Sequence, residues 1–218
     1  MDILTANFST FLQGAWVTVQ VTVFAALLGA VFALFSGVGM LSRRRWVRSV
    51  SRIYMEVFRG VSALVLMFWM VFSLPILTDI RVTPFTGAVL ALALNIGAYE
   101  AEIVRGGVQS VPKGQWEAAT ALNLSPTRRL RKVILPQAVA IMIPPWGTMT
   151  IHLLKASSLV SLVNVVDLTF EARQLQVTLG PESTVPLYTG LLIWYFVLAQ
   201  ILARLFEWME RRATVGRA

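Results

Sequence analysis

The side chains capable of specific chemistry gather in one polar stretch, residues 98–137, which separates two long apolar segments. Within this stretch Glu117 precedes two alanines, and glycine, proline and basic residues recur on both sides of it. Loops between packed segments are where proteins place residues that engage partners. We therefore interpret residues 98–137 as a functional surface loop of a membrane protein that recognises a partner.

The other reactive residue types argue against catalysis and metal binding. Cysteine is absent, so the chain has no thiolate nucleophile and no thiolate metal site. The single histidine, His152, has apolar neighbours and is interpreted as a satisfied helix residue rather than a ligand. No Gly-x-x-x-x-Gly-Lys-Ser/Thr motif occurs, so the chain does not bind ATP through a P-loop. We expect a chain that is not an enzyme, with no metal or cofactor of its own.

Composition places the chain among membrane proteins. Hydrophobic residues make up 56% of its 218 residues, and the mean hydropathy is +0.69. Soluble domains rarely reach such a value. The net charge of +8 arises from 19 basic and 11 acidic residues. Because the basic residues cluster in short loops, membrane topology explains them better than nucleic-acid binding does.

Five segments meet the requirement of about 20 mostly apolar residues for a helix that crosses a bilayer. They are residues 14–41, 54–77, 84–104, 138–163 and 185–209. We expect the second segment to be interrupted at its start by Glu56 and Arg59 and to bend or end near Pro75. We expect the fourth to be broken at Pro144-Pro145 and again at Lys155-Ala156-Ser157-Ser158. The sequence predicts one all-α integral membrane domain over residues 1–218, with its core at about 12–210.

The distribution of basic residues predicts the orientation of these helices. Arginines and lysines are frequent in 43–52, in 105–132 and in 204–217, whereas the alternate loops carry only Arg81 and Arg173. Loops rich in Lys and Arg remain in the cytoplasm. The N-terminus is therefore expected outside and the C-terminus inside, which five crossings satisfy.

Proline and asparagine divide the polar loop into short helices. Pro112 suits a helix start, where its missing N–H has no partner to lose. Residues 115–122 favour one short helix. Asn123 follows it and tolerates the left-handed conformation that ends many helices. These features predict a short helix that ends at a defined turn.

A second short helix is expected directly after that turn. Ser125-Pro126 is suited to cap and begin a helix that continues through residues 128–133. Pro136 follows at the start of the fourth apolar segment. The result is a rigid helix–turn–helix bracket that is able to transmit movement. An ordinary interfacial loop of a generic membrane protein explains the physics of the pattern equally well.

The exact amino-acid sequence of the loop is more informative than its helix-start and turn signals. It resembles the Glu-Ala-Ala loop of permease subunits in ATP-binding-cassette importers, in the version of the polar amino acid uptake group. The resemblance covers roughly residues 12–210. The matching motifs are Glu56-Val57-Phe58-Arg59-Gly60, Tyr99…Glu102…Arg105-Gly106-Gly107, Val111-Pro112-Lys113-Gly114-Gln115-Trp116, Glu117-Ala118-Ala119, Ile134-Leu135-Pro136 and Leu153-Leu154-Lys155-x-Ser-Ser-Leu.

This resemblance implies a fold, a site and a set of partners. The fold is that of a type I importer permease in a bacterial inner membrane. The loop at about 105–136 would couple to two ATP-binding subunits, which would hold ATP and magnesium. A second permease, the same chain or a sister, and an extracytoplasmic solute-binding protein would complete the complex. The implied coupling residues are Lys113, Gly114, Gln115, Trp116, Glu117, Ala118, Ala119, Asn123 and Pro136.

Two departures from the family pattern concern the turn and the second helix. The family glycine of the loop is Asn123 here, which preserves the turn. Val61, Ser62 and Leu66 stand where the family often has Thr-Pro and a glutamine. The second helix is therefore less polar than usual, and its contact with the solute is in doubt.

Polar residues within the apolar segments are candidates for the translocation path. A charge inside the bilayer is costly, so Lys155 is expected to face the bundle interior, either beside the path or paired with an acid such as Glu102 or with a carbonyl. The candidate path residues are Asn95, Tyr99, Glu102, Lys155, Ser157 and Ser158. Core hydrogen bonding is an equal alternative for Asn95 and Tyr99. An ion pair between Glu102 and Arg105, three residues apart, is expected ahead of solute contact.

The identity of the solute is the least determined feature. Ala121-Leu122-Asn123, Glu56-Val57-Phe58-Arg59-Gly60 and residues 167–172 resemble ectoine and hydroxyectoine permeases. The sequence therefore predicts a small zwitterion, with ectoine or hydroxyectoine first. The alternative is a polar amino acid such as glutamine, glutamate, histidine or arginine. A stand-alone secondary transporter is a more distant alternative, under which the loop would have no purpose.

Overall fold

Helices form all the regular structure in residues 5–214, the part of the chain that the computed structural model describes. Four helical runs in that part are long and apolar enough to cross a membrane. They are α2 (Phe8–Met40), α6 (Pro84–Gln109), the run Pro126–Val163 and the run Pro181–Ala213. A bent pair of helices adds a fifth crossing if its two halves count as one span. The predicted all-helical membrane fold is confirmed.

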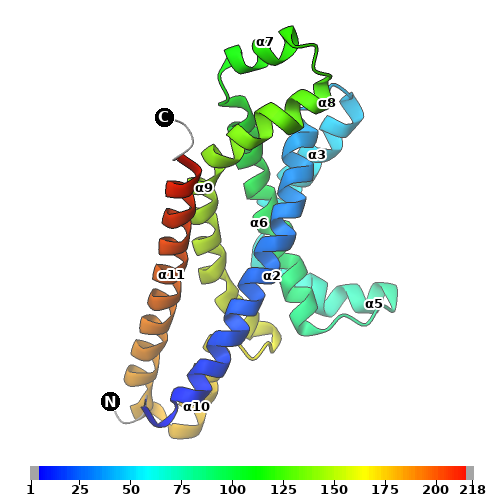
Figure 1. Ribbon diagram of the computed structural model, residues 1–218. Coiled ribbons are helices and arrows are strands. Elements are labelled where there is room, and N and C mark those ends of the chain that lie inside the picture. The colour runs from blue at the N-terminus through cyan, green and yellow to red at the C-terminus, as the bar shows by residue number, and fades with distance from the viewer. Residues whose placement is uncertain (1–4, 215–218) are drawn as a thin grey trace.

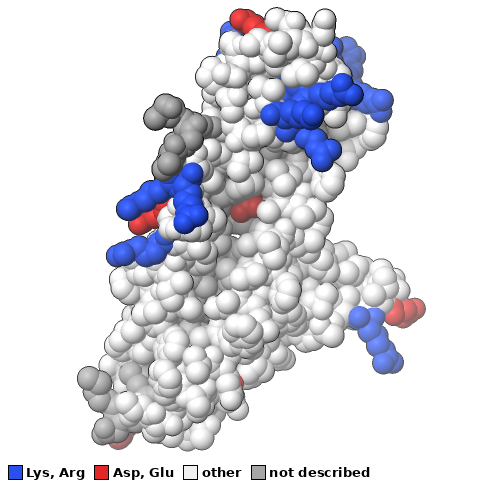
Figure 2. Space-filling view, in the orientation of Figure 1, with Lys and Arg blue, Asp and Glu red and all other residues white. Residues whose placement is uncertain are grey.

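The two ends of the molecule differ in what they carry. Figure 1 shows α7 (Lys113–Ala121) and α8 (Pro126–Arg129) together at one end, and α10 (Leu168–Leu179) at the other. Helix α2 begins at the α10 end, whereas α11 (Thr184–Thr214) finishes toward the α7 end. This arrangement agrees with an odd number of crossings. In Figure 2, lysines and arginines gather at the α7 end and beside the end of α11.

The longest interface of the fold joins α2 to α6, and small residues allow it to be close. A Cβ atom at Gly29 would lie 2.6 Å from a side-chain carbon of Ile96, and one at Gly37 would lie 2.7 Å from the Ala101 carbonyl oxygen. Glycine therefore lets the two backbones approach, as small residues do between membrane helices. Buried apolar residues such as Val21, Ala25 and Leu92 fill the same interface.

The second predicted span is broken by a sharp bend directly after Arg59, close to where Glu56 and Arg59 were expected to interrupt it. Helix α3 (Arg45–Gly60) ends at Gly60, and α4 (Ala63–Phe68) starts a segment that runs through Thr78 at 101° to it. Pro75, where a bend was expected, lies inside α5 (Leu74–Thr78), just after a π-helical turn, η1 (Trp69–Ser73). Figure 1 shows α5 projecting from the side of the bundle.

The fourth span is continuous through its two prolines, contrary to the expected break. Helix α9 (Leu135–Ala156) contains Pro144 and Pro145 without interruption. Membrane helices tolerate proline because neighbouring helices and local adjustments satisfy the freed backbone groups. The expected break near Ser157 is confirmed, since the chain tightens there into the 3-10 helix η3 (Ser157–Val163). A second 3-10 turn, η4 (Pro181–Ser183), leads into α11.

Candidate functional site

Helix α7 forms where the sequence places a start signal. Pro112 has an extended ψ of 139° and acts as the N-cap, and Gln115 donates its backbone N–H to the Pro112 carbonyl at 3.0 Å. Helical residues run from Lys113 to Ala121, two residues earlier than predicted at the start. The predicted first helix of the loop is confirmed.

The end of α7 is fixed by a left-handed turn at Asn123. Its φ is +51°. The N–H of Asn123 reaches the Thr120 carbonyl at 2.9 Å, and the N–H of Leu124 reaches the Ala119 carbonyl at 3.2 Å. These two bonds form a Schellman motif, which requires a left-handed residue where Asn123 stands. The predicted conformation of Asn123 is confirmed, and the turn has one defined geometry.

The two faces of α7 differ in exposure. Ala119 is buried, and Trp116 packs on a buried cluster that includes Val108 and Ile134. Gln115 accepts a hydrogen bond at 3.0 Å from the Gln137 side chain, which ties α7 to α9. The exposed face carries Lys113, Gly114, Gln115, Glu117 and Ala118. The helix is thus anchored on one side and presents the other to solvent.

The second half of the loop merges with the fourth span instead of forming a separate helix. Ser125 precedes α8, and Arg129 donates its backbone N–H to the Ser125 carbonyl at 2.9 Å, but the Ser125 hydroxyl makes no cap bond. A π-helical turn, η2 (Leu130–Ile134), then leads directly into α9, with Pro136 at its second residue. π turns often absorb local irregularities in a helix. Helices α8 and α9 are therefore continuous through η2, with no non-helical joint between them.

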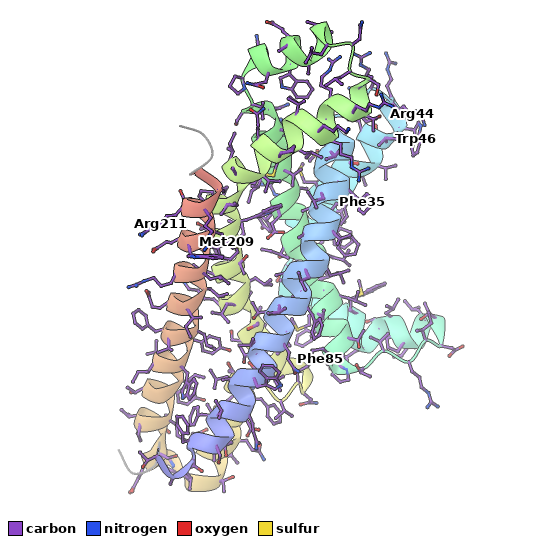
Figure 3. The ribbon with its side chains drawn as sticks, viewed as in Figure 1. Phe35, Arg44, Trp46, Phe85, Met209 and Arg211 are labelled. Carbon is purple, nitrogen blue, oxygen red and sulfur yellow. The ribbon has the colours of Figure 1, made fainter. Side chains whose placement is uncertain are left out.

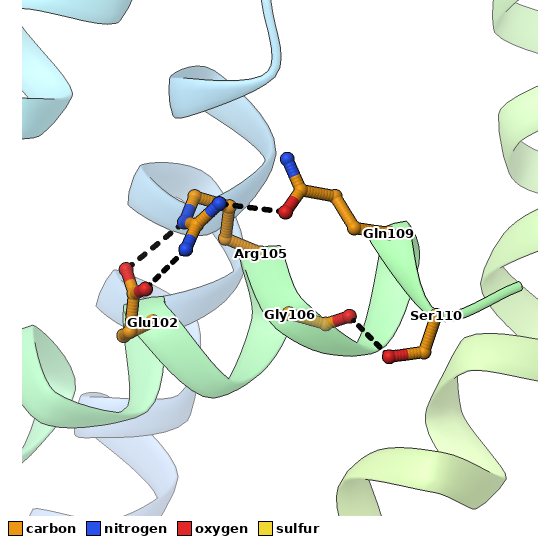
Figure 4. Close-up of polar contacts among 5 residues, drawn as sticks. All are labelled: Glu102, Arg105, Gly106, Gln109 and Ser110. Carbon is orange, nitrogen blue, oxygen red and sulfur yellow. Dashed lines mark hydrogen bonds and ion pairs between the residues drawn. The ribbon is translucent and has the colours of Figure 1, made fainter.

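Near the C-terminal end of α6, Glu102 and Arg105 form the expected ion pair. Figure 4 shows Arg105 between Glu102 and Gln109. Its Nε lies 3.0 Å from Glu102 Oε2, and its Nη1 lies 2.6 Å from Gln109 Oε1. Ser110, which follows the helix, donates its hydroxyl to the Gly106 carbonyl at 2.8 Å. The two charges of the pair are therefore engaged with each other.

Asn95 and Tyr99 fasten the bend between α3 and α4 onto α6. The Asn95 amide donates to the Phe58 carbonyl at 2.8 Å, and the Tyr99 hydroxyl donates to the Arg59 carbonyl at 3.4 Å. The Arg59 guanidinium lies 5.2 Å from the centre of the Tyr99 ring, within the range of a cation–π contact. These bonds satisfy carbonyl groups that the end of α3 leaves unpaired.

The same two residues line a cavity of about 290 Å³ between α6 and α9. Most of its wall is apolar, and its polar side chains are Asn95, Tyr99 and His152. A largely apolar cavity with a few convergent polar groups is the common form of a small-molecule site. The complete lining is Leu92, Asn95, Ile96, Tyr99, Met149, His152, Leu153 and Ala156.

His152 was not predicted as a site residue, and the cavity brings it into the site. His152 is exposed on the single chain and lies on the wall of the cavity. The spacing of His152 to Met149 and Ala156, three and four residues, was the available signal, because such residues share a helix face.

The other four predicted path residues do not line this cavity. Lys155 is exposed on the single chain, and Glu102 pairs with Arg105 instead of with Lys155. Ser157 is fully buried and donates to the Leu154 carbonyl at 2.7 Å, while Ser158 donates to the Lys155 carbonyl at 2.8 Å. Both hydroxyls are thus bonded to their own helical turn.

Glu100 is the most deeply buried acidic side chain of α6. It is 3% exposed, and its Oε2 atom has no hydrogen-bond partner among the described residues. It does not line the cavity. Within residues 5–214 no group of three or more His, Cys, Asp or Glu residues is arranged to hold a metal ion.

The family model described as "Binding-protein-dependent transport system inner membrane component" matches residues 8–215. Among curated proteins, the chain is 45% identical to a probable amino-acid ABC transporter permease, y4tF of Sinorhizobium fredii (strain NBRC 101917 / NGR234), over 94% of this chain and 87% of that protein. It is 32% identical to the glutamine transport system permease GlnP of Escherichia coli (strain K12), over 94% and 93% of the two chains.

A solved structure shares the fold over nearly its whole length. The crystal structure of an amino acid ABC transporter with histidines superposes with a TM-score of 0.86 and 32% sequence identity, and the match covers 96% of each chain. The arrangement of helices described above is therefore that of a transporter subunit of known architecture.

Proposed function

Because the chain belongs to the family of binding-protein-dependent transport system inner membrane components, we propose that it carries a polar amino acid through the membrane in steps driven by a partner ATPase. The family membership makes it a multi-pass inner-membrane permease of an ATP-binding-cassette importer for amino acids, and not an enzyme. Permeases of this family work with ATP-binding subunits and a solute-binding protein.

The cavity between α6 and α9 is the observation that carries the proposed role. It places an amide, a phenol and an imidazole, from Asn95, Tyr99 and His152, on an otherwise apolar wall. These groups donate and accept hydrogen bonds, and the wall suits the aliphatic part of an amino acid. We assign the solute to this cavity, with Asn95 and Tyr99 retained from the predicted path and His152 added.

The exposed face of α7 is the proposed contact for the ATP-binding subunit. Glu117 and Lys113 project from it, while Trp116 and Gln115 hold the helix to the transmembrane part. Since α8, η2 and α9 are continuous, a push on α7 tilts or shifts the helix that forms one wall of the cavity. Such a rigid-body shift is one of the known ways in which sites are coupled.

The orientation follows the charge distribution. The end of the bundle that carries α7, α8 and the arginines near residue 44 faces the cytoplasm, as positively charged loops do. The α10 end then faces the solute-binding protein. ATP and Mg²⁺ would be held by the partner ATPase, and two permease chains, identical or sister, would enclose the path.

A polar amino acid is supported better than ectoine as the solute. The relatives described above carry the words amino acid, glutamine and histidines in their names. The predicted preference for ectoine or hydroxyectoine finds no support in these comparisons. Both kinds of solute are small zwitterions, so the choice changes the cargo and leaves the mechanism unaltered.

The proposal is tested with the importer assembled in proteoliposomes from this permease, its ATPase and its solute-binding protein. ATP hydrolysis is followed while glutamine, glutamate, histidine, arginine, ectoine and hydroxyectoine are added in turn. Stimulation by one or more amino acids is expected. Stimulation by ectoine alone would reverse the solute assignment, and no ATPase bound to the permease would reject the mechanism.

A further inference from the structure

A second cavity, separate from the solute cavity, lies between the end of α2 and the loop that carries α7 and α8. Its volume is about 400 Å³. It is lined by Val38, Leu41, Ser42, Arg43, Trp116, Pro126, Thr127, Arg129 and Leu130. None of these side chains is acidic, and two are arginines from different parts of the chain. The proposed function assigns no role to this cavity.

The two arginines leave donors available for an anion. Arg129 gives one Nη2 hydrogen bond to the Leu124 carbonyl at 3.4 Å, but its Nε is buried and has no hydrogen-bond partner in the described part of the chain. The Arg129 Nε is therefore a donor that no protein group uses, and it can serve an acceptor that enters the cavity. Arg43 is exposed, and no acidic partner is found for it within residues 5–214. Guanidinium groups bind phosphate through paired hydrogen bonds.

An apolar surface leads directly into this cavity. Val31, Phe35 and Val38 follow one another at intervals of four and three residues, so they lie on one face of α2, and Leu41, Ser42 and Arg43 directly after the helix continue into the cavity lining. Phe35 is 78% exposed, whereas Val38 lines the cavity. Figure 3 shows Phe35 on the same side of the molecule as Arg44 and Trp46, below them along the bundle.

Helix α3 places the same region at the level of lipid headgroups. Trp46, Val50, Ile53 and Val57 form an exposed apolar stripe at the same intervals, and Arg48 and Arg52 lie between them in the sequence. Amphipathic helices with basic residues and tryptophan lie in the membrane interface. The cavity is thus open to a molecule that has an anionic head and apolar chains.

We infer that this cavity binds the headgroup of an anionic phospholipid, whose phosphate is held by Arg43 and Arg129 while its acyl chains lie along the α2 stripe that contains Phe35. A phosphate group alone would satisfy the arginines equally. The apolar stripe is the reason to assign the site to a lipid. Basic pockets at this membrane level are known lipid sites in other proteins. Because Trp116 of α7 lines the same cavity, a bound headgroup also braces the loop that contacts the ATPase.

The test measures lipid retained by the intact importer. The complex is purified in detergent, and native mass spectrometry follows the binding of phosphatidylglycerol and of phosphatidylcholine with the same acyl chains. The variants are Arg43→Gln and the double variant Arg43→Gln/Arg129→Gln. Arg81→Gln is the matched control, because Arg81 is also exposed but lies between α5 and α6. Thermal unfolding of each complex confirms that it is folded.

We expect phosphatidylglycerol to bind more weakly by roughly five-fold for each arginine removed, with phosphatidylcholine and the Arg81→Gln control unchanged. Equal phosphatidylglycerol binding in all variants would overturn the inference. If the arginine variants lose the ATPase subunit while lipid binding is unchanged, the cavity serves the protein partner and the inference is wrong. If inorganic phosphate adds mass to the wild-type complex but not to the double arginine variant, while phosphatidylglycerol binds both equally, the cavity is an anion site rather than a lipid site and the inference is wrong.

Discussion

The left-handed turn at Asn123 gives the sharpest prediction about coupling. With φ at +51°, this residue holds the Schellman motif that ends α7. Replacement by glycine relieves any strain, because glycine adopts this conformation freely. Replacement by valine adds backbone strain, because the left-handed region costs an L-residue about 1–2 kcal/mol and a β-branched residue is a genuine outlier there.

The magnitude is large enough to measure. A cost of about 1.4 kcal/mol changes the ratio of intact to frayed turn about ten-fold. The turn lies outside the packed transmembrane helices, so the cost falls on the geometry of the loop rather than on the stability of the bundle. We expect Asn123→Gly to transport normally, and Asn123→Val to take up several-fold less solute per ATP hydrolysed.

The assay is ATP-driven uptake of labelled amino acid in proteoliposomes, with ATP hydrolysis measured in parallel. Leu122→Val is the matched control, because Leu122 is 75% exposed and has an ordinary φ of −80°. It introduces the same side chain one residue earlier at little conformational cost. Equal coupling in Asn123→Val and Asn123→Gly would refute the argument that a fixed turn transmits the movement.

Three further predictions concern packing, pH and the solute cavity. Gly37→Ala is expected to destabilise the fold by about 1–3 kcal/mol, because its Cβ would lie 2.7 Å from the Ala101 carbonyl oxygen. Thermal unfolding in detergent measures this loss of stability. Gly106→Ala is the control that must not lose stability, because a Cβ at Gly106 meets no atom within 4 Å. Burial raises the pKa of Asp167 from 3.8 to about 6, so its contribution to stability is present below about pH 4 and is lost as the pH rises through about 6, by about 2–3 kcal/mol. The variant Asp167→Asn keeps a good N-cap and should show a smaller fall in Tm over that pH range. An equal fall in Tm would contradict the assignment of the pH dependence to Asp167. Asn95→Leu should weaken the stimulation of ATP hydrolysis by solute while the ATPase stays bound. Unchanged stimulation at limiting solute concentration would contradict the role of Asn95 in the translocation path.

The helix boundaries and the ion pair of the loop region could be predicted from the sequence because each depends on residues close together in the chain. Pro112, Asn123 and the pair Glu102–Arg105 act over three to five residues, through helix starts, helix ends and helix faces. Each of these predictions agrees with the geometry. The positions of the long apolar segments were likewise fixed by composition.

The features that sequence reasoning missed depend on long-range packing. The bend after Gly60 is stabilised by bonds from Asn95 and Tyr99, which lie about 40 positions further along the chain. Two adjacent prolines signal a break, but their neighbours in the membrane keep α9 intact.

The most direct test of the central claim is uptake by an importer that carries Glu117→Lys in the exposed face of α7. The complex is reconstituted with ATP inside the vesicles and with the solute-binding protein and labelled amino acid outside, beside Arg81→Gln as control. The account predicts that the permease remains in the membrane but that uptake is lost, because ATP hydrolysis is uncoupled or the ATPase is released. Undiminished uptake by Glu117→Lys would contradict the claim that α7 links the ATPase to the path.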